Sequence, residues 1–220
     1  MKHLAWNCRG LGNPRTVREL HHMVKDKSLD VIFLSETKCK RDRMECIRNK
    51  LNFDQSFTVD CVGRSGGLAF FWKKEVEAEL NSYSNHHISL TIHPAALERS
   101  NILTGFYGQP IATRRKESWS LIRLLQSHIQ CPWLCLGDFN EILLQEEQFG
   151  SHVRPFQQMK AFRTVIEDCG LKDLDFNGDS YTWSNRREGS EFTKARLDRV
   201  FVNKDWMDLK YHNSMQVLPA

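Results

Sequence analysis

The sequence predicts a single layered α/β domain with mixed sheets that spans residues 1–220. Two observations support this prediction. Short apolar runs that stop at glycine or polar residues alternate with segments whose apolar residues recur at helical spacing. Other apolar runs follow one another directly, as the strands of hairpins do, so both parallel and antiparallel strands are expected. No repeat, low-complexity tract or flexible linker divides the chain.

The first half of the chain is expected to contain five strands, over residues 4–10, 30–36, 66–73, 87–93 and 101–108. The run at 87–93 alternates apolar and polar residues, which is typical of a half-buried strand. Asn13 followed by Pro14 predicts the start of a helix, with a capping side chain and proline in the first turn. Val17, Leu20 and Val24 would share one face of that helix.

The second half is expected to contain two helices and three strands. A helix over residues 114–129 would turn Trp119, Ile122, Leu125 and Ile129 inward. A helix over residues 156–169 would end at Gly170, which serves as its C-terminal cap. The predicted strands cover residues 133–138, 180–185 and 195–203.

Composition and charge narrow the class of protein. Hydrophobic residues make up 40% of the chain, and the net charge of +4 with a pI near 8.7 permits a polyanionic partner without demanding one. No run approaches the ~20 apolar residues of a membrane span. Arg9 stands where a signal peptide would need apolar residues. An intracellular protein is therefore expected. Its seven cysteines are an odd number with no CxxC pair, which favours reduced, packed thiols over disulfides or zinc.

Acids and amides stand at the ends of the apolar strands. Glu36 ends the strand at 30–36, Asp138 ends the strand at 133–138, and Asn7 lies in the first strand. Asp198 lies just before an apolar run. Burying such groups is costly unless they are compensated, and strand ends are where α/β folds build their sites. Oxygen ligands gathered from distant segments suit Mg²⁺.

Each of these residues also has a simpler explanation. The sequence GDFN at 137–140 is compatible with a turn held by an aspartate side chain, and SETK at 35–38 with a helix cap. Asp198 lies between Arg196 and Arg199 and could form an ion pair with them. Tyr107 could be an amphipathic core residue. The joint pattern, rather than any single member, predicts a site.

Seven motifs together resemble one known family. They are WNCRGLG, LSETK, GRSGGLAFFW, GFYG, PWLCLGDFNEIL, YTWSN and RLDRVFVN, in that order. The ordered set is similar to the endonuclease domain of plant-type LINE (non-LTR) retrotransposons, a member of the endonuclease/exonuclease/phosphatase superfamily. The resemblance covers essentially the whole chain. It implies a four-layer α-β-β-α sandwich of two mixed sheets, with the active site at one edge.

The resemblance also implies residue roles in phosphodiester hydrolysis. Glu36 would be the main ligand of Mg²⁺, or of Mn²⁺ as an alternative ion, with Asn7 beside it. Asp138 would orient the attacking water or assist the leaving group, so Glu36, Asn7 and Asp138 are expected to converge. The remaining implied roles are phosphate donation by Asn140 and Tyr107, orientation of a histidine by Asp198, DNA-backbone contact by Thr182 or Asn185, and substrate binding by Arg9.

The family's C-terminal Ser-Asp-His motif is not found in these 220 residues. None of the nine histidines stands in such a triplet, and His152 and His212 in the later half lack its context. The surrounding residues favour capping or surface roles for His86, His87 and the other histidines. The expectation is therefore a sandwich without its last strand and impaired hydrolysis, because a general base or acid typically contributes ~10²–10⁴-fold in rate.

Three functions follow as alternatives. The first is a Mg²⁺-dependent DNA endonuclease that nicks target DNA for reverse transcription, which would place the protein in the nucleus. The second is an inactive remnant that still binds DNA, and the third is a phosphoesterase of the same superfamily. Basic residues at positions 9, 38, 40, 41, 43, 186 and 187 favour DNA as the partner. No membrane and no stable protein partner are expected.

Overall fold

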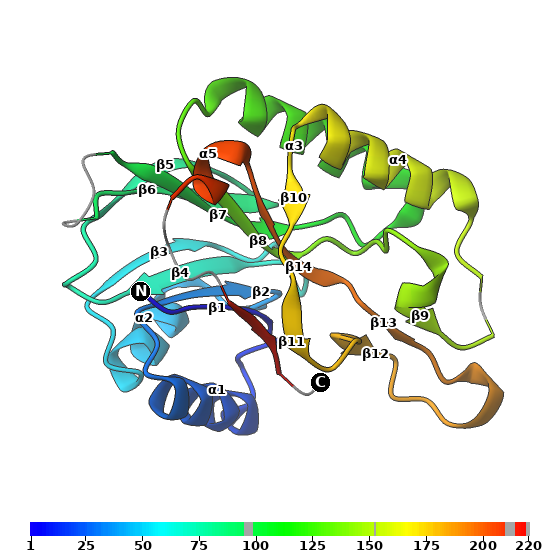
Figure 1. The fold of residues 1–220 in the computed structure, drawn as a ribbon. Helices are drawn as coiled ribbons and strands as arrows, with labels where there is room; N and C mark the ends of the chain where they lie inside the picture. Colours follow the sequence, from blue (N-terminus) through cyan, green and yellow to red (C-terminus); the bar gives the residue numbers. More distant parts are fainter. Residues whose placement is uncertain (95–98, 152, 210–213, 219–220) are drawn as a thin grey trace. The chain divides into compact units, whose positions relative to one another are not determined.

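The computed structural model describes residues 1–94, 99–151, 153–209 and 214–218, so His152 and His212 lie outside the described residues (Figure 1). It shows an α/β fold with mixed sheets, which confirms the predicted fold class. Two compact units divide the chain, Met1–Tyr107 and Gly108–Ala220. Each unit is built around sheets that are covered by helices.

The first unit contains a four-stranded sheet in the order β1-β2-β4-β3. Its strands are β1 (His3–Asn7), β2 (Val31–Ser35), β4 (Leu68–Trp72) and β3 (Gln55–Val59). Strand β1 runs parallel to β2, while β2 and β3 each pair with β4 in the antiparallel sense. The connection between the parallel strands is helix α1 (Pro14–Lys27). It begins as predicted, because the Asn13 side chain accepts a hydrogen bond from the amide of Arg15.

Helix α2 (Arg41–Lys50) was not predicted. Its sequence, RDRMECIRNK, is mostly charged, and Met44 and Ile47 are its only buried residues, so its apolar periodicity is faint. Both helices nevertheless cover one face of the four-stranded sheet. The core on that face includes Leu20, Val24, Ile32, Leu34, Met44, Ile47, Ala69 and Phe71. Tertiary packing, rather than intrinsic preference, stabilises α2.

A second sheet of the first unit packs on the other face of the four-stranded sheet. It is an antiparallel run of β5 (Ala78–Ser84), β6 (His87–Ile92) and β7 (Asn101–Tyr107). Gly105 on β7 lies so close to the Phe33 ring that a Cβ atom there would come within 2.1 Å of it. The prediction of a half-buried β6 was wrong. Ser89, for example, is fully buried, and a hydrogen bond of 2.8 Å between its hydroxyl and that of Thr104 compensates for the loss of water.

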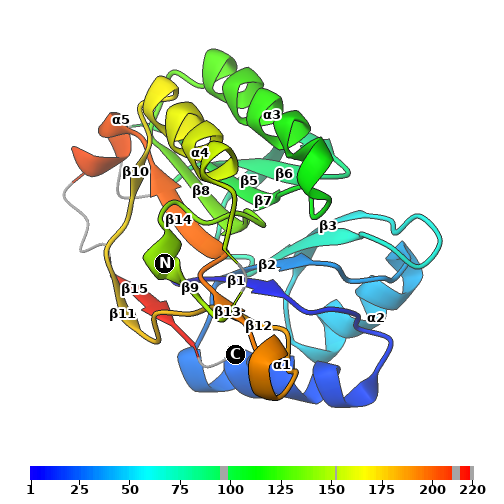
Figure 2. The same cartoon turned by 90° about the vertical axis from the view of Figure 1, so that its right-hand side faces the viewer.

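The second unit contains the antiparallel strands β10 (Lys172–Asp173), β14 (Asp198–Val202) and β8 (Trp133–Asp138). Helices α3 (Arg115–His128) and α4 (Phe156–Asp168) lie side by side, as Figures 1 and 2 show. Aromatic rings join these helices to the strands. Trp119 stacks on Phe162 at 4.6 Å, and Phe162 meets Phe201 edge-on at 5.9 Å. The predicted bounds of both helices are correct to within one residue.

The rest of the second unit consists of short elements. Strands β12 (Trp183–Ser184), β13 (Lys194–Ala195) and β9 (Gln148–Phe149) form one small sheet, and β11 (Phe176–Gly178) pairs with β15 (Met215–Val217). Helix α5 (Lys204–Met207) and the 3-10 turns Ala112–Arg114, Gln145–Glu147 and Gly189–Glu191 complete it. The predicted strands at 180–185 and 195–203 were too long. The second is interrupted at 196–197, where the backbone binds the Thr182 hydroxyl instead of a neighbouring strand.

The seven cysteines all lie within the described residues, and none of them forms a disulfide, as predicted. Cys8 and Cys135 are buried, and burial raises the pKa of the Cys8 thiol to about 12. These thiols therefore stay protonated at neutral pH and behave as small apolar side chains. No described helix combines the length and the apolar composition needed to cross a membrane.

Candidate active site

Glu36 is the centre of a polar group in the first unit. It directly follows β2, and Asn7 is the last residue of the parallel neighbour β1, so both emerge at the same edge of the sheet. Asn7 donates from Nδ2 to Glu36 Oε1 at 2.9 Å. Tyr107, the last residue of β7, donates from its hydroxyl to the same oxygen at 2.9 Å. The structure thus brings together three of the residues singled out in the sequence.

Two glycines hold the Glu36 loop in place. The amides of Thr37 and Lys38 donate to the carbonyls of Gly67 and Gly66, at 3.1 Å and 3.0 Å. Gly67 has a φ of +86°, and a Cβ atom there would lie 2.3 Å from the Thr37 hydroxyl oxygen. Only glycine fits this approach. The sequence suggested these glycines only as the start of a strand, and their supporting role was missed.

The donor set around Glu36 fits a magnesium ion. Glu36 Oε1 accepts both hydrogen bonds, and Oε2 lies 3.5 Å from Lys38 Nζ, an interaction that a stronger cation could replace. The Asn7 side-chain oxygen could serve as a second hard oxygen donor to such an ion. Within the described residues, no group of three or more His, Cys, Asp or Glu is arranged to hold a metal. Mg²⁺ suits such a site, because it keeps several waters and takes only one or two carboxylates.

Asp138 and Asn140 form a second polar group, in the second unit. Asp138 ends β8 and is only 3% exposed. Its Oδ1 accepts from the backbone amide of Asn140 at 2.8 Å, which is the aspartate turn considered as the simpler explanation. The Asn140 side chain donates to the Gly108 carbonyl at 2.8 Å, and the Gly108 amide donates to the Asp138 carbonyl at 2.7 Å. The turn therefore holds the Asn140 amide in a defined place.

Asp198 lies directly opposite Asp138 in the pairing of β14 with β8. Its backbone amide donates to the Thr182 hydroxyl at 2.9 Å, so Thr182 fixes the start of β14. The flanking arginines have other partners. Arg199 contacts Asp173 at 2.5 Å, and Arg196 contacts the same carboxylate at 3.2 Å. Glu147 joins this cluster as a further partner of both arginines.

The Asp173 cluster is mostly buried. Burial raises the pKa of the Asp173 carboxyl, and the guanidinium groups of Arg199 and Arg196 counteract that rise. Adjacent residues of a strand point to opposite faces of the sheet, so Arg199 and Asp198 extend to different sides. Arg199 therefore pairs with Asp173, and not with Asp198 as the simpler explanation had suggested.

The last predicted contacts concern Asn185 and Arg9. Asn185 accepts from the amides of Arg187 and Thr193, both at 3.1 Å, and donates to the Glu191 carbonyl at 2.7 Å. Its side chain closes the loop between β12 and β13. Arg9 is exposed, and its amide donates to the Asn7 side-chain oxygen at 3.2 Å. The DNA contacts predicted for Arg9, Thr182 and Asn185 stay predictions, as does the convergence of Asp138 with Glu36.

Strained backbone marks the predicted motifs. Seven non-glycine residues in the described part of the chain have a positive φ of 50–57°. Ser28 and Asn52 follow the ends of α1 and α2, where such a conformation is common. The other five are Arg9, Glu36, Lys38, Asn140 and Arg186, and all lie in or beside the motifs singled out in the sequence. Left-handed non-glycine residues concentrate at functional sites because their strain must be held by the surrounding structure.

Comparison with known proteins identifies the family. A family model described as "Endonuclease/Exonuclease/phosphatase family" matches residues 4–212. The chain belongs to this family. No curated protein matches it in sequence.

Among solved structures, the endonuclease domain of TRAS1, a telomere-specific non-LTR retrotransposon, matches with a TM-score of 0.66 and 15% identity, over 91% of this chain and 85% of that one. An AP endonuclease from Archaeoglobus fulgidus matches with a TM-score of 0.68 and 13% identity, over 91% of this chain and 85% of that one. A 3'-5' exonuclease from Neisseria meningitidis matches with a TM-score of 0.67 and 18% identity, over 92% of this chain and 87% of that one. These similarities establish the endonuclease/exonuclease/phosphatase fold.

Glu141, next to Asn140, was missed by the sequence reasoning. Its side chain is fully buried and receives Arg115 Nη1 at 2.5 Å and Arg154 Nε at 3.2 Å. It also accepts from the amide of Ile142 at 3.0 Å. In this family member, the buried ion cluster fastens the turn that carries Asn140 to the start of α3. An acid inside the apolar run NEILL was the available signal, since such an acid must be compensated.

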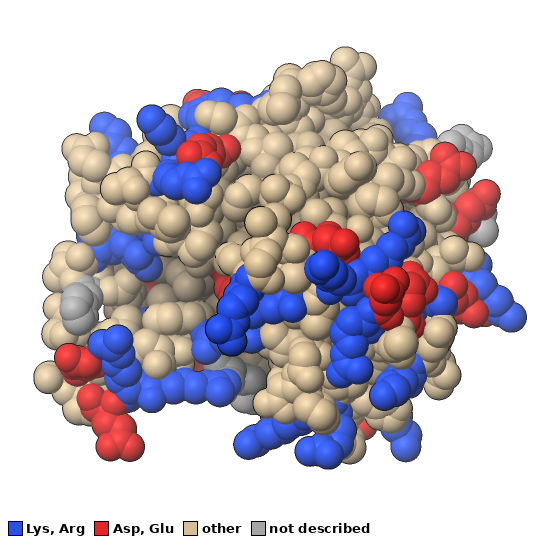
Figure 3. Space-filling model, turned by 180° about the vertical axis from the view of Figure 1, so that it is seen from behind, with Lys and Arg blue, Asp and Glu red and all other residues tan. Residues whose placement is uncertain are grey.

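Four basic residues follow Glu36 closely in the sequence: Lys38, Lys40, Arg41 and Arg43. Figure 3 shows that Lys and Arg side chains on one side of the molecule form several groups, some of them interrupted by acidic side chains. On the face that Figure 3 shows, the basic charge therefore occurs in local groups rather than as one continuous field. Arg187 pairs with Glu191 at 2.9 Å.

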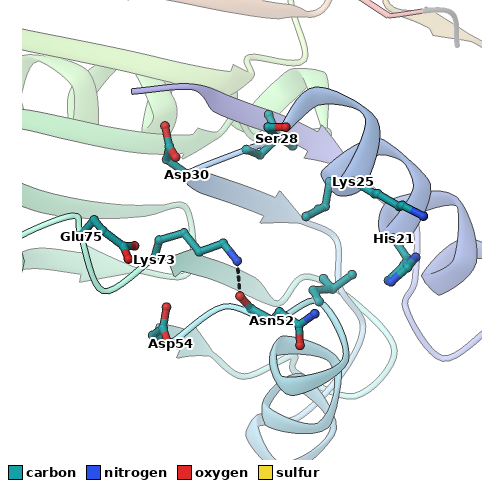
Figure 4. A pocket seen from close by; sticks show the side chains of 11 residues that line it. His21, Lys25, Ser28, Asp30, Asn52, Asp54, Lys73 and Glu75 are labelled. Atoms are coloured by element: carbon teal, nitrogen blue, oxygen red, sulfur yellow. Dashed lines mark hydrogen bonds between the residues drawn. The ribbon is translucent and has the colours of Figure 1, made fainter.

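A pocket of about 830 Å³ lies at the other ends of the strands of the first unit (Figure 4). Asp30, which precedes β2, lines it, whereas Glu36 follows the same strand. Lys73 donates to the Asn52 carbonyl on one wall. The lining mixes basic, acidic and apolar side chains and contains none of the predicted site residues: His21, Val24, Lys25, Ser28, Leu29, Asp30, Leu51, Asn52, Asp54, Lys73 and Glu75.

Proposed function

We propose that this chain is a Mg²⁺-dependent DNA endonuclease that nicks target DNA for a retrotransposon and acts in the nucleus. The observation that carries the proposal is the double hydrogen bond to Glu36 Oε1 from Asn7 and Tyr107. It orients the carboxylate and leaves Oε2 turned toward a cation, the place that Lys38 takes here. Membership of the family supports phosphodiester hydrolysis as the reaction.

The residues have separate tasks in this proposal. Glu36 and Asn7 would hold the ion, which neutralises charge that develops on phosphate oxygens when it is bound. The Tyr107 hydroxyl, whose one proton is donated to Glu36 here, would turn to a phosphate oxygen when substrate is bound, and the Asn140 amide would donate to the phosphate as well. Asp138 would hold the attacking water in line by accepting one of its protons. Asp198, beside Asp138, would keep the local charge negative and the accepting oxygen basic.

DNA is the proposed substrate because of the basic residues and the structural similarities. The TRAS1 domain is an endonuclease of a non-LTR retrotransposon, and a second Neisseria structure, similar at a TM-score of 0.66 and 15% identity, is a 3' phosphatase bound to a product DNA hairpin. The arginines and lysines that follow Glu36 and Asn185 would neutralise backbone phosphates.

Nicking of supercoiled plasmid tests the proposal. Open circles should accumulate with Mg²⁺, should not form with EDTA, and should disappear in Glu36→Gln. DNA binding without any Mg²⁺-dependent nicking would instead establish the inactive remnant. Hydrolysis of nucleotide or inositol phosphates but not of DNA would establish the phosphoesterase. If Glu36 and Asp138 serve one reaction, the double variant Glu36→Gln, Asp138→Asn should be no slower than the worse single variant.

A further inference from the structure

His86 lies beside Tyr107 on the turn between β5 and β6. Its Nδ1 lies 2.9 Å from the Tyr107 carbonyl oxygen, and its ring is nearly parallel to the Tyr107 ring, at 10° and 6.1 Å between centroids. Its backbone amide donates to the Ser84 hydroxyl at 3.1 Å. The turn is therefore held by Ser84 independently of the imidazole ring. From the sequence alone, only a surface or capping role was expected for His86.

The register of β6 and β7 explains what the imidazole does. The last regular pair joins His87 to Phe106, so Tyr107 stands one residue beyond it. The Tyr107 amide still finds the His86 carbonyl, at 2.8 Å. The Tyr107 carbonyl accepts from the His86 side chain at 2.9 Å. The imidazole thus extends the ladder by one hydrogen bond at the position from which the Tyr107 hydroxyl reaches Glu36.

The chemistry of the bond sets the tautomer. A carbonyl oxygen only accepts, so Nδ1 carries the proton and the bond exists in both the neutral and the protonated ring. The stacking contact is weaker than this bond, since 6.1 Å is near the upper end of the range for interacting rings. The hydrogen bond from Nδ1 is therefore the stronger of the two contacts that the His86 ring makes with Tyr107.

We propose that His86 is a positioning residue for Tyr107: its Nδ1–H fixes the backbone of Tyr107, and thereby aims the Tyr107 hydroxyl at Glu36. The expected effect on the rate of hydrolysis rests on the proposed function. The geometric part, however, concerns only contacts within the first unit. His87 has a different role, because its ring is buried and hydrogen-bonded to Ser82 and Ser84 at 3.2 Å and 2.8 Å.

A spectroscopic test follows from the tyrosine content. The chain has four tyrosines, so a protein labelled with ¹³Cζ-tyrosine shows four resonances, and Tyr107→Phe identifies that of Tyr107. His86→Phe retains a ring without a donor, whereas the side-chain amide of His86→Asn takes the place of Nδ1. We expect the Tyr107 resonance to shift in His86→Phe and His86→Ala and to stay in place in His86→Asn. His22→Ala, an exposed histidine of α1, is the matched control.

The kinetic test uses nicking of plasmid. His86→Ala should lower kcat by about tenfold or more while KM changes little, since a small displacement of a catalytic group slows the reaction. His86→Asn should restore most of the rate. The double variant His86→Ala, Tyr107→Phe should be no slower than Tyr107→Phe alone, because His86 acts through that hydroxyl. Independent, multiplying losses would overturn the proposal in favour of a direct role for His86.

The two readouts separate this proposal from the proposed function. Should the wild-type chain show no Mg²⁺-dependent nicking, the endonuclease proposal fails, while the Tyr107 resonance still decides the role of His86. A Tyr107 resonance that is unchanged in His86→Ala overturns the positioning role, whatever the activity. Thermal unfolding of each variant excludes loss of the fold, and His86→Asn provides the folded comparison.

Discussion

Asp198 stands directly opposite Asp138 where β14 pairs with β8, so two acidic side chains face the same side of the sheet from adjacent strands. Directly opposed like charges destabilise a sheet. Asp138 is held there by the turn to Asn140, and Asp198 by the Thr182 hydroxyl. Both acids are thus fixed in position by neighbouring groups, as their proposed part in hydrolysis would require.

Asp198→Asn should therefore separate activity from stability. We expect plasmid nicking to fall by up to about 10²-fold, because Asp138 would be a weaker proton acceptor without the neighbouring charge. The free energy of unfolding should stay the same or rise by up to about 1 kcal/mol, because the repulsion is removed. Urea unfolding and nicking rates check both parts, with the exposed Asp208→Asn as control. A clear loss of stability would show that Asp198 is mainly a structural residue.

Glu36→Gln should abolish Mg²⁺-dependent nicking and leave the fold intact. The amide retains the shape of the side chain but removes the charge that would hold the ion. The free energy of unfolding should change by less than about 1 kcal/mol, since Glu36 is partly exposed and its ion pair with Lys38 is long. Glu19→Gln on α1, an exposed acid paired with Arg15, is the control. Equal nicking by the two variants would remove Glu36 from the site.

Binding to duplex DNA should weaken steeply with salt. Each lysine or arginine that contacts a phosphate releases condensed counterions, so several contacts cost about tenfold or more in affinity between about 50 and about 200 mM salt. Lys40→Ala and Arg41→Ala should each make the slope shallower by about one. Lys25→Ala, at the pocket on the other ends of the strands, should not change the slope. Affinity that is independent of salt would contradict DNA binding.

Two histidines whose pKa is lowered in the folded state should make the protein less stable in mild acid. Burial lowers the pKa of His3 and of His87 from 6.5 to about 4 in the folded state. Between these values the unfolded chain binds more protons than the folded chain, so the free energy of unfolding falls as pH decreases from about 6.5 to about 4. Urea unfolding at several pH values measures this. His3→Gln should flatten the slope, and the exposed His22→Gln should leave it unchanged.

Glu141→Gln should destabilise the protein strongly. The substitution leaves Arg115 and Arg154 without their shared carboxylate in a buried place, which typically costs about 3–5 kcal/mol. Burial already lowers the pKa of Arg154, against the influence of Glu141. Glu117→Gln, which breaks an exposed pair with Arg114, should cost less than about 1 kcal/mol. Similar losses in the two variants, measured by urea unfolding, would show that the cluster adds little.

Much of the fold could be predicted because local patterns encode it. The apolar runs at 31–35, 68–72 and 133–138 are strands in the structure, and α1 begins where Asn13 and Pro14 indicate. Helix α2 and strands β3 and β5 were missed. Their sequences are polar, and they become ordered through contacts with distant segments, as Met44 and Ile47 do in the core beneath α2.

The sequence by itself determined which residue types stand at the strand ends: Glu36, Asn7, Asp138 and Asp198 were all visible there. Only the tertiary structure decided which atoms meet. Tyr107 is 71 residues from Glu36 yet donates to it, and His86 became relevant only through the register of β6 with β7. The physical reason is range. Periodicity and capping act over a few neighbouring residues, whereas a hydrogen bond between distant segments depends on how the whole sheet is paired and packed.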